Sequence, residues 1–408
     1  MTAITRINRA DLFMVGIAYA GFIALGIPST LLNIAWSPYM RETFGLSLDS
    51  LGLLLIASTA GYFFASFSSG RIISRLGIGA LLLTSSLLGV AGLLGYALSS
   101  NWPALIVFAL LTGSAGGLMD GGMNIYFAAT YGPRLMNWLH ACFGVGATIG
   151  PLLMTTFIHS GQSWRWGYAV TAAIYGALAM TFALTRGRWR AAEMPAGTTS
   201  HAPARARDVL LLPAVWIGVA VFFAYGGLEV AAGQWSSTLF TETRAVPAQI
   251  AERWVSLYWG SFTIGRFLYG AIANRIQVVT VIRLCMLGAL AGTVLIWWNP
   301  ANEVGFMGLA LVGFAQAPVF PLLVTNTQER LGPKLAPHAI GFQIAAASLG
   351  IALVPALAGV LAQNIRVEII APFLVVTAVV IVALYEFSLR IGDLRRRGQG
   401  TRTPDAGD

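Results

Sequence analysis

The chain has 408 residues, of which 57% are hydrophobic and only 10% are charged, and its net charge is +9. A soluble domain carries roughly a quarter charged residues to hydrate its surface, so this composition excludes an ordinary soluble protein. The mean hydropathy of +0.73 indicates instead an outer surface that faces hydrocarbon. The 46 glycines fit this interpretation, because small residues let membrane helices approach closely.

The apolar residues gather into twelve segments, each near or above the roughly 20 residues that a helix needs to cross a bilayer. The predicted spans are residues 12–39, 46–68, 78–98, 102–130, 135–159, 166–185, 210–240, 250–273, 278–298, 304–326, 336–363 and 369–389. No small-residue cleavage site follows the short polar start, so we expect the first segment to be a spanning helix and not a removable signal peptide.

One long polar stretch divides these spans into six and six. We therefore expect an N-terminal six-helix bundle over residues 1–185 and a C-terminal bundle over residues 209–390. Residues 186–208 are predicted to be a flexible cytoplasmic linker. Residues 391–408 are predicted to be a disordered cytoplasmic tail whose arginines contact anionic lipid headgroups.

The distribution of the 25 lysines and arginines predicts the orientation. Most of them lie on the side of the predicted bilayer that holds both termini and the linker, and such an excess marks the cytoplasmic side. The exceptions are Arg41, Arg165, Arg244, Arg253 and Arg366. We expect a multi-pass protein of a bacterial inner membrane with both termini in the cytoplasm. The cations lie in short turns and form no basic face with interleaved aromatics, so no nucleic-acid partner is expected.

An internal repeat supports the division into halves. Glycines, prolines and an arginine recur at shifts of 200 to 204 residues: Gly26 with Gly226, Gly70 with Gly270, Arg75 with Arg275, Gly146 with Gly350, and Pro151 with Pro355. Glycine is abundant, so each match alone is weak. Together they keep nearly one register, as duplication of a six-helix unit predicts.

Two segments carry the resemblance to a family. Residues 69–77 and 265–275 resemble the loop motif between the second and third helices of the major facilitator superfamily. The matching positions are Gly70, Arg71 and Arg75, and in the second half Gly265, Arg266, Asn274 and Arg275. Ser74 and Asn274 replace the usual acid, so the family's Asp–Arg lock between the halves is expected at most in a weaker polar form.

The resemblance covers essentially the whole chain. It implies an all-α membrane protein with 12 transmembrane helices in two six-helix bundles, related by a pseudo-two-fold axis along the membrane normal. Residues 117–124, 137–146 and 225–235 are similar to the fucose-permease-like and rhizopine-transporter-like branch. The resemblance implies a secondary transporter, here expected to be a monomer, whose partners are a small-molecule solute, protons and the lipid bilayer.

Two acidic residues lie well inside predicted spans, Asp120 in the fourth and Glu229 in the seventh. An ionisable group in hydrocarbon is costly, so it normally faces a polar cavity and has a function. In the branch that the chain resembles, an acid on the fourth helix couples transport to protons, and Asp120 resembles it. The alternative is a structural acid bonded to Asn124 on the same helix face. Glu229 is expected to titrate or to accept hydroxyls of the solute, unless it pairs with an arginine.

Amides and indoles surround these acids in the sequence. Apolar ring faces of a sugar stack on tryptophan while its hydroxyls bond to amides and carboxylates. The predicted substrate-binding residues are Asn33, Trp36, Asn124, Glu229, Gln234, Trp235, Trp259, Gln316 and Gln343. His140 is a candidate proton relay or, equally, a group that bridges helices. In the resembling branch the first helix often carries an acid where this chain has Ser29, so the family's coupling scheme does not carry over whole.

Three functions remain in competition. The first is uptake of a sugar- or polyol-like solute by alternating access in symport with protons. The second is efflux of a hydrophobic or amphiphilic compound, because residues 146–151 resemble the fifth-helix signature of antiporters, although Leu152 and Leu153 replace the glycine pair that follows it. The third is an enzyme or a non-transporting receptor, and the absence of a phosphate-binding loop, metal cluster or nucleophile motif argues against the enzyme. No cofactor or metal is expected, and a uniporter would have the same architecture.

Overall fold

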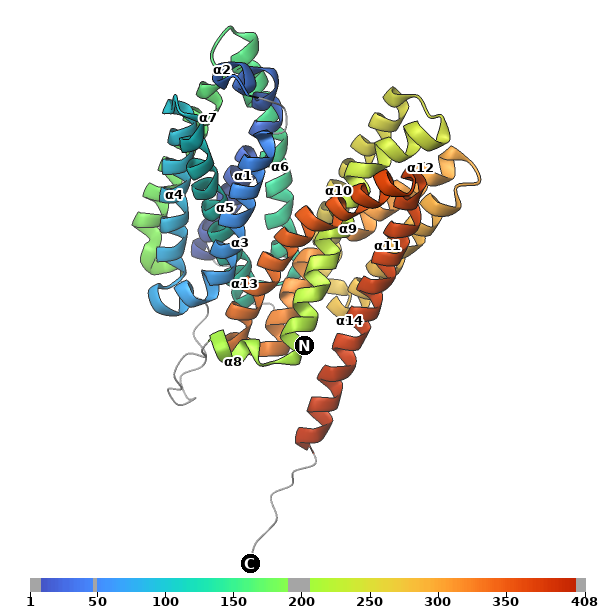
Figure 1. Cartoon of the computed structure of the whole chain (residues 1–408). Coiled ribbons are helices and arrows are strands. Elements are labelled where there is room, and N and C mark those ends of the chain that lie inside the picture. The colour runs from blue at the N-terminus through green and yellow to red at the C-terminus, as the bar shows by residue number, and fades with distance from the viewer. Residues whose placement is uncertain (1–8, 47–49, 190–205, 401–408) are drawn as a thin grey trace, which may run out of the picture. The chain divides into compact units, whose positions relative to one another are not determined.

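The computed structural model describes residues 9–46, 50–189 and 206–400, and all regular structure within these ranges is helical (Figure 1). The first part contains α1 (Arg9–Ala35), η1 (Trp36–Met40), α2 (Arg41–Phe44), α3 (Leu51–Leu76), α4 (Ile78–Leu98), α5 (Trp102–Thr130), α6 (Pro133–His159), α7 (Arg165–Thr185) and η3 (Arg186–Arg188). The second contains α8 (Ala206–Leu210), α9 (Pro213–Arg244), α10 (Ala248–Ile272), η4 (Ala273–Arg275), α11 (Val278–Trp298), α12 (Asn302–Gln316), α13 (Val319–Asn364), η5 (Val367–Ile369) and α14 (Ile370–Gly400).

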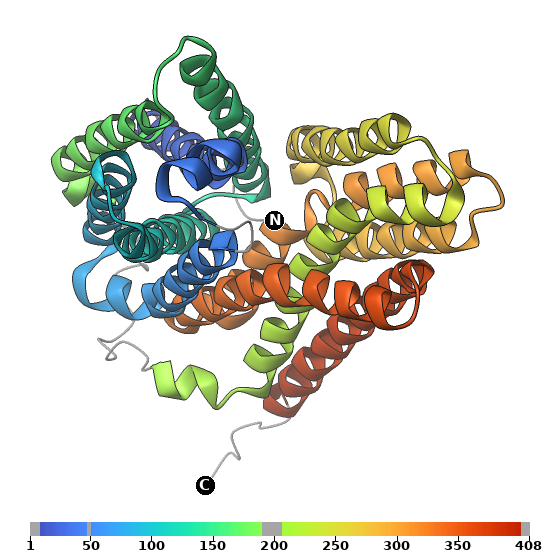
Figure 2. The same cartoon turned by 45° about the horizontal axis from the view of Figure 1, so that its top comes forward.

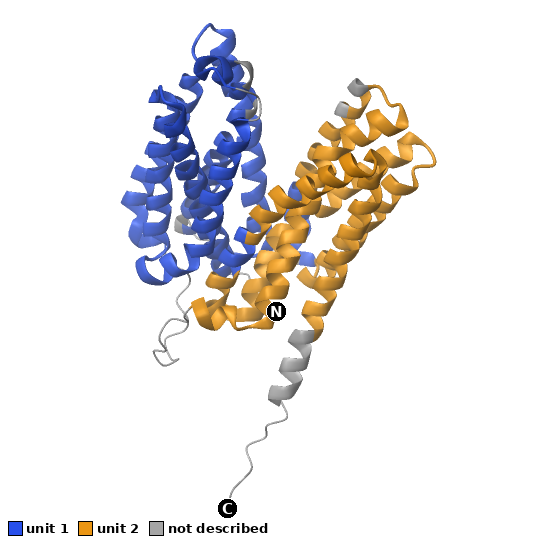
Figure 3. Cartoon of the chain, in the orientation of Figure 1, with its two compact units in different colours: residues 1–203, 266–275, 340–345 blue, residues 204–265, 276–339, 346–408 orange. Residues whose placement is uncertain are grey.

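The chain divides into two compact units (Figure 3). Unit 1 contains Met1–Pro203 together with the short segments Arg266–Arg275 and Ile340–Ala345, and unit 2 contains the rest. The units change over at residue 203, inside the stretch 186–208 that the sequence marks as a linker. Most of that stretch, residues 190–205, lies outside the described residues.

Each unit is a bundle of long helices (Figures 1 and 2). In unit 1, α3 packs along α5, α1 along α6, and α4 between α5 and α7. In unit 2, α11 packs against α12 and α14, and α9 against α14. Glycines permit this close packing, since an added Cβ at Gly113 would lie 1.9 Å from the carbonyl oxygen of Ser58 on α3.

The glycines of the sequence repeat occupy equivalent contacts in the two units. An added Cβ at Gly146 would lie 1.9 Å from the carbonyl oxygen of Ile23, and one at Gly350 would lie 1.9 Å from that of Phe223. Ile23 and Phe223 are themselves 200 residues apart. In each unit, the first and fifth helices of the bundle are therefore in backbone contact at the same place, as two copies of one fold require.

Ten described segments are long and apolar enough to cross a membrane. The tenth and eleventh predicted spans fall in one of them, Asn302–Asn364. The predicted eighth span is α10, which is long enough but less apolar because Arg253 and Arg266 lie along it. Large apolar side chains such as Leu184 and Phe64 are exposed on the bundles, which is the surface that hydrocarbon covers.

The structure corrects several predicted boundaries. The second span does not end at residue 68, because α3 continues to Leu76 and only Gly77 separates it from α4. The tenth span is broken after Gln316, since Pro318 has no N–H to continue the helix. The tenth and eleventh spans meet at a kink at Gly332 (φ 71°) and not in a polar loop. The last helix, α14, continues to Gly400 and so includes residues 391–400 of the predicted tail; residues 401–408 lie outside the described part of the chain.

Candidate functional site

Asp120 lies on α5 and is buried within unit 1, with 7% of its surface exposed. The hydroxyl of Tyr62, on α3, donates a hydrogen bond to Oδ2 of Asp120. Glycine places the two helices this close: an added Cβ at Gly117 would lie 2.4 Å from the carbonyl oxygen of Tyr62. The glycine-rich run around Asp120 is thus what allows a tyrosine of the neighbouring helix to reach the carboxyl.

Asn124 lies one helical turn beyond Asp120 and is fully buried. Its side-chain nitrogen donates to Oδ1 of Asp120 at 2.7 Å and to the backbone oxygen of Asp120 at 2.9 Å. Its side-chain oxygen lies 2.9 Å from Nε2 of His140 on α6. The amide therefore links the carboxyl of α5 to the imidazole of α6, and its hydrogen-bonding groups all have partners within unit 1.

His140 completes this chain of groups. Its ring meets the ring of Phe22, on α1, edge to face at a centroid distance of 5.4 Å. Its backbone oxygen accepts a hydrogen bond of 3.2 Å from the guanidinium of Arg266, in the part of α10 that belongs to unit 1. Tyr62, Asp120, Asn124 and His140 thus form one buried network, with a cation at its His140 end.

Asp120, Asn124 and His140 were predicted from the sequence as site residues, but Tyr62 was not. A signal for it existed, because Tyr62 and Ser66 are polar residues four apart in an apolar span, on one helix face. This spacing predicts a polar helix face, but it does not predict that the face contacts Asp120.

Glu229 is half-buried on α9 in unit 2. The hydroxyl of Tyr258, on α10, donates a hydrogen bond of 2.7 Å to the backbone oxygen of Glu229. Gly233, one turn further along α9, lies against the ring of Trp259, to which an added Cβ would approach within 2.7 Å. The structure therefore brings Trp259, which is 41% exposed, beside the turn of α9 that follows Glu229.

Gln234 and Trp235 follow on the same helix. Gln234 is exposed, whereas Trp235 is half-buried and donates from its indole nitrogen to the carbonyl oxygen of Pro355 at 2.8 Å. The ring of Trp235 also covers Gly359 of α13, where an added Cβ would lie 2.6 Å from it. The indole of Trp235 therefore packs against α13 and links it to α9.

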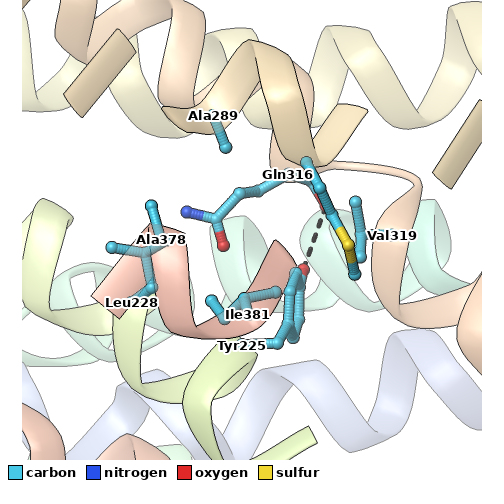
Figure 4. Close-up of a pocket in the computed structure, with 8 residues that line it drawn as sticks. Tyr225, Leu228, Ala289, Gln316, Val319, Ala378 and Ile381 are labelled. Atoms are coloured by element: carbon cyan, nitrogen blue, oxygen red, sulfur yellow. Dashed lines mark hydrogen bonds between the residues drawn. The ribbon is translucent and has the colours of Figure 1, made fainter. Parts of the chain in front are cut away.

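Gln316 ends α12 and points into a small cavity of unit 2 (Figure 4). The cavity has about 10 Å³ of room for a water-sized sphere, which is enough for one water molecule. Its other lining residues are Tyr225, Leu228, Met286, Ala289, Val319, Ala378 and Ile381. Among the described residues, neither Nε2 nor Oε1 of Gln316 has a hydrogen-bond partner, although the hydroxyl of Tyr225 donates to its backbone oxygen at 3.0 Å.

The other predicted substrate-binding residues are dispersed. Trp36 begins the π-helical turn η1 and is buried, with its ring 5.9 Å from that of Trp102. Gln343 is buried in the segment Ile340–Ala345 of unit 1. The side chains of Asn33 and Asn274 lie outside the described part of the chain.

The motif residues lie on helices. Gly70, Arg71 and Arg75 occupy the last turns of α3, where Gly70 is buried and both arginines are exposed. The hydroxyl of Ser74 bonds to the carbonyl oxygen of Arg71 in its own helix, at 2.9 Å. In the second copy, Gly265 lies against Phe314 of α12 and Arg275 is exposed in η4. Among the motif residues whose side chains the structure describes, Arg266 reaches the network around Asp120, through the backbone oxygen of His140.

Comparison with known proteins identifies the family. The sequence model of the Major Facilitator Superfamily matches residues 18–341 and 246–404, which together cover nearly the whole chain. The chain belongs to the major facilitator superfamily. It is therefore a multi-pass membrane transporter and not an enzyme, as the motifs of the sequence predicted.

Individual relatives have low sequence identity to this chain, but the matches extend over most of both proteins. A putative glucose/galactose transporter of Helicobacter pylori is 25% identical over 371 residues, covering 81% of this chain and 84% of the relative. The glucose/mannose transporter GlcP of Bacillus subtilis is 24% identical over 358 residues, covering 84% of this chain and 86% of the relative.

Solved structures confirm the predicted fold. The structure of the E. coli fucose:proton symporter matches with a TM-score of 0.76 at 16% identity, covering 92% of this chain and 98% of that one. The fucose-permease-like architecture that residues 117–124, 137–146 and 225–235 indicated is thus confirmed as a fold. The likeness to rhizopine transporters stays a prediction.

Proposed function

We propose that this protein carries a small polar solute, sugar- or polyol-like, across a bacterial inner membrane by alternating access in symport with protons. The observation that carries the proposal is the carboxyl of Asp120, buried in the middle of an apolar helix and bonded to Tyr62 and Asn124. Burying a carboxylate is costly, and a bound proton removes that cost during crossing. The names of two relatives, a putative glucose/galactose transporter and a glucose/mannose transporter, support a sugar-like solute.

The proposed solute site is on unit 2, around Glu229. Glu229 offers acceptors for hydroxyl groups, Gln234 an exposed amide, and Trp259 an exposed ring beside the same helix turn. This combination of one acid, one amide and an aromatic face suits a sugar-like ring. The network around Asp120 binds the proton, and both termini are cytoplasmic in a monomeric protein.

Proteoliposomes that contain the purified protein test the proposal. Addition of a transported sugar should acidify the lumen or alkalinise the medium, and Asp120→Asn should abolish that pH change while solute exchange persists. The control is Glu303→Gln, which neutralises an exposed acid in the first turn of α12 and should leave proton movement unchanged. Proton movement at the native rate in Asp120→Asn contradicts the proposal.

Glu229 is tested separately by solute binding. Glu229→Gln should raise the apparent dissociation constant for the sugar by about tenfold or more, because a charge-assisted hydrogen bond contributes roughly 1.5–3 kcal/mol. Affinity equal to that of the unchanged protein removes Glu229 from the proposed solute site but leaves the proton site untouched.

The resemblance of residues 146–151 to an antiporter signature supported efflux, and helix packing offers another explanation for it. The glycines of residues 146–151 are used for packing: an added Cβ at Gly150 would lie 2.3 Å from Oγ1 of Thr30, and Gly146 lies against α1 in the same way. Close packing of α1 and α6 therefore explains the pattern without antiport. Drug-driven proton release from the same proteoliposomes, with no response to sugars, would favour efflux.

A further inference from the structure

The geometry around Asp120 shows which of its two oxygens is able to carry a proton. Asn124 donates from one nitrogen to both the backbone oxygen and Oδ1 of Asp120, at 2.9 and 2.7 Å. A backbone carbonyl oxygen only accepts hydrogen bonds. The nitrogen of the Asn124 amide therefore faces Asp120 whether or not the carboxyl is protonated.

This fixed amide also determines the hydrogen on the histidine. The oxygen of Asn124 has to face away from Asp120, and it lies 2.9 Å from Nε2 of His140. An amide oxygen only accepts, so Nε2 of His140 carries a hydrogen. An O–H group on Oδ1 of Asp120 would find no acceptor in the Asn124 amide, which presents an N–H group to that oxygen.

The second oxygen, Oδ2, faces a group of a different kind. The hydroxyl of Tyr62 is both a donor and an acceptor, and it donates to Oδ2 when the carboxyl is charged. The hydroxyl of Ser66 lies one turn further along α3, on the same helix face as Tyr62. Ser66 itself donates to the carbonyl oxygen of Gly117 at 3.2 Å, which leaves its oxygen able to accept from Tyr62.

We propose that the transported proton binds to Oδ2 of Asp120 and that Tyr62 is the residue that senses it by reversing its hydrogen bond. With Asp120 charged, the Tyr62 hydroxyl donates to Oδ2. With Asp120 neutral, the new O–H donates to the oxygen of Tyr62, whose own hydrogen turns to Ser66. No covalent bond of Tyr62 breaks. The inference rests on the proposed proton coupling and adds to it the binding atom and a positioning residue.

The surroundings of the carboxyl fit this assignment. Within the described residues, the titratable and charged groups of this network are Tyr62 on α3, which contacts Asp120 directly, and His140 on α6 and Arg266 on the unit 1 part of α10, which follow beyond Asn124. Arg266 lies at the His140 end of the network, where it donates to the backbone oxygen of His140. The Oδ2 side is occupied by the hydroxyl of Tyr62, so that side is where a neutral O–H group finds an acceptor.

The sensing residue adjoins a tight contact of unit 1. An added Cβ at Gly341, in the segment Ile340–Ala345, would lie 2.6 Å from the backbone oxygen of Ser66. The ring of Phe67 stacks on that of Phe342 with centroids 4.5 Å apart. A change at Tyr62 and Ser66 therefore occurs one helical turn from, and at Ser66 directly within, the surface of α3 that this segment covers.

The test compares Tyr62→Phe with Asp120→Asn in proteoliposomes. Tyr62→Phe should keep sugar counterflow, which needs no net proton movement, within about twofold, and should reduce proton-driven accumulation about tenfold, the effect of losing one hydrogen bond to a charged group. The matched control is Tyr168→Phe on α7, a buried tyrosine whose hydroxyl has no partner among the described residues. It should change neither rate.

Infrared difference spectroscopy provides a readout that a purely structural role would not move. The carbonyl band of protonated Asp120, assigned by its loss in Asp120→Asn, should shift to higher frequency in Tyr62→Phe and should not shift in Tyr168→Phe. If Tyr62→Phe proves unstable, Ser66→Ala should give the same selective loss of accumulation to a smaller degree. An unshifted band with normal accumulation in Tyr62→Phe overturns the inference while leaving the proton site at Asp120 intact. Proton movement in Asp120→Asn overturns both.

Discussion

The indole nitrogen of Trp235 donates a 2.8 Å hydrogen bond to the carbonyl oxygen of Pro355 and so ties α9 to α13 within unit 2. The same ring lies over Gly359, one turn beyond Pro355. The exposed Gln234, the residue before Trp235 on α9, is therefore attached to a helix turn that this packed tryptophan holds in place. A change that disturbs this contact should therefore lower the stability of the bundle and also alter the proposed solute site.

Gly359→Ala should displace the ring of Trp235. The added Cβ would lie 2.6 Å from a ring carbon, and overpacking of this kind costs typically about 1–3 kcal/mol. We expect a lower thermal midpoint in detergent together with weaker sugar binding. Gly176→Ala on α7 is the control, because nothing lies within 4 Å of its added Cβ. A normal midpoint for Gly359→Ala would mean that α13 yields at this point without cost.

Arg244 and Glu368 form an ion pair at 3.0 Å in which the arginine side chain is only 6% exposed. The guanidinium also donates to the carbonyl oxygen of Ile296 at 2.8 Å. Arg244→Gln removes the charge and leaves Glu368 without this partner, and we expect a loss of about 1–3 kcal/mol, less than for a fully buried pair because Glu368 reaches solvent. Thermal unfolding monitored by tryptophan fluorescence measures it.

The comparison for this prediction is Arg283, which pairs with Glu386 at 2.6 Å but is 49% exposed. Exposed pairs contribute at most about 1 kcal/mol, so Arg283→Gln should lower the midpoint less than Arg244→Gln does. Equal losses in the two variants would show that burial of Arg244 adds nothing to its pair.

Hydropathy predicted much of the fold because a bilayer demands long apolar helices. The predicted spans 78–98 and 102–130 coincide with α4 and α5. Where prediction failed, the deciding contacts were tertiary: the break after Gln316 and the kink at Gly332 interrupt a segment whose hydropathy is continuous. Turn glycines and prolines mark such points in the sequence but do not say which of them bends a buried helix.

The contacts of the buried network within one helix could be predicted from the sequence, but those between helices could not. Asp120 and Asn124 could be paired from their spacing on one helix, because a four-residue separation fixes the geometry. The partners on other helices, Tyr62 and His140, depend on how closely α3 and α6 approach α5. Gly117 sets the α3 approach through a backbone contact, and no periodicity in the sequence reports such a distance.

The side chain of Gln316 is predicted to destabilise the folded protein. Its amide is 2% exposed and has no hydrogen-bond partner among the described residues, inside a cavity whose walls are mostly apolar. A buried polar group without a partner costs about 1–3 kcal/mol. Gln316→Met keeps the length of the side chain and removes the amide, so we expect a higher thermal midpoint.

Sugar binding decides between two roles for this residue. The cavity has about 10 Å³ of room for a water-sized sphere, which suits one water molecule and not a sugar ring. We therefore expect Gln316→Met to bind sugar with unchanged affinity, measured by isothermal titration in detergent beside Glu229→Gln. A loss of affinity as large as that of Glu229→Gln would instead make Gln316 part of the solute site, as the sequence first suggested, and would require the cavity to widen when the solute binds.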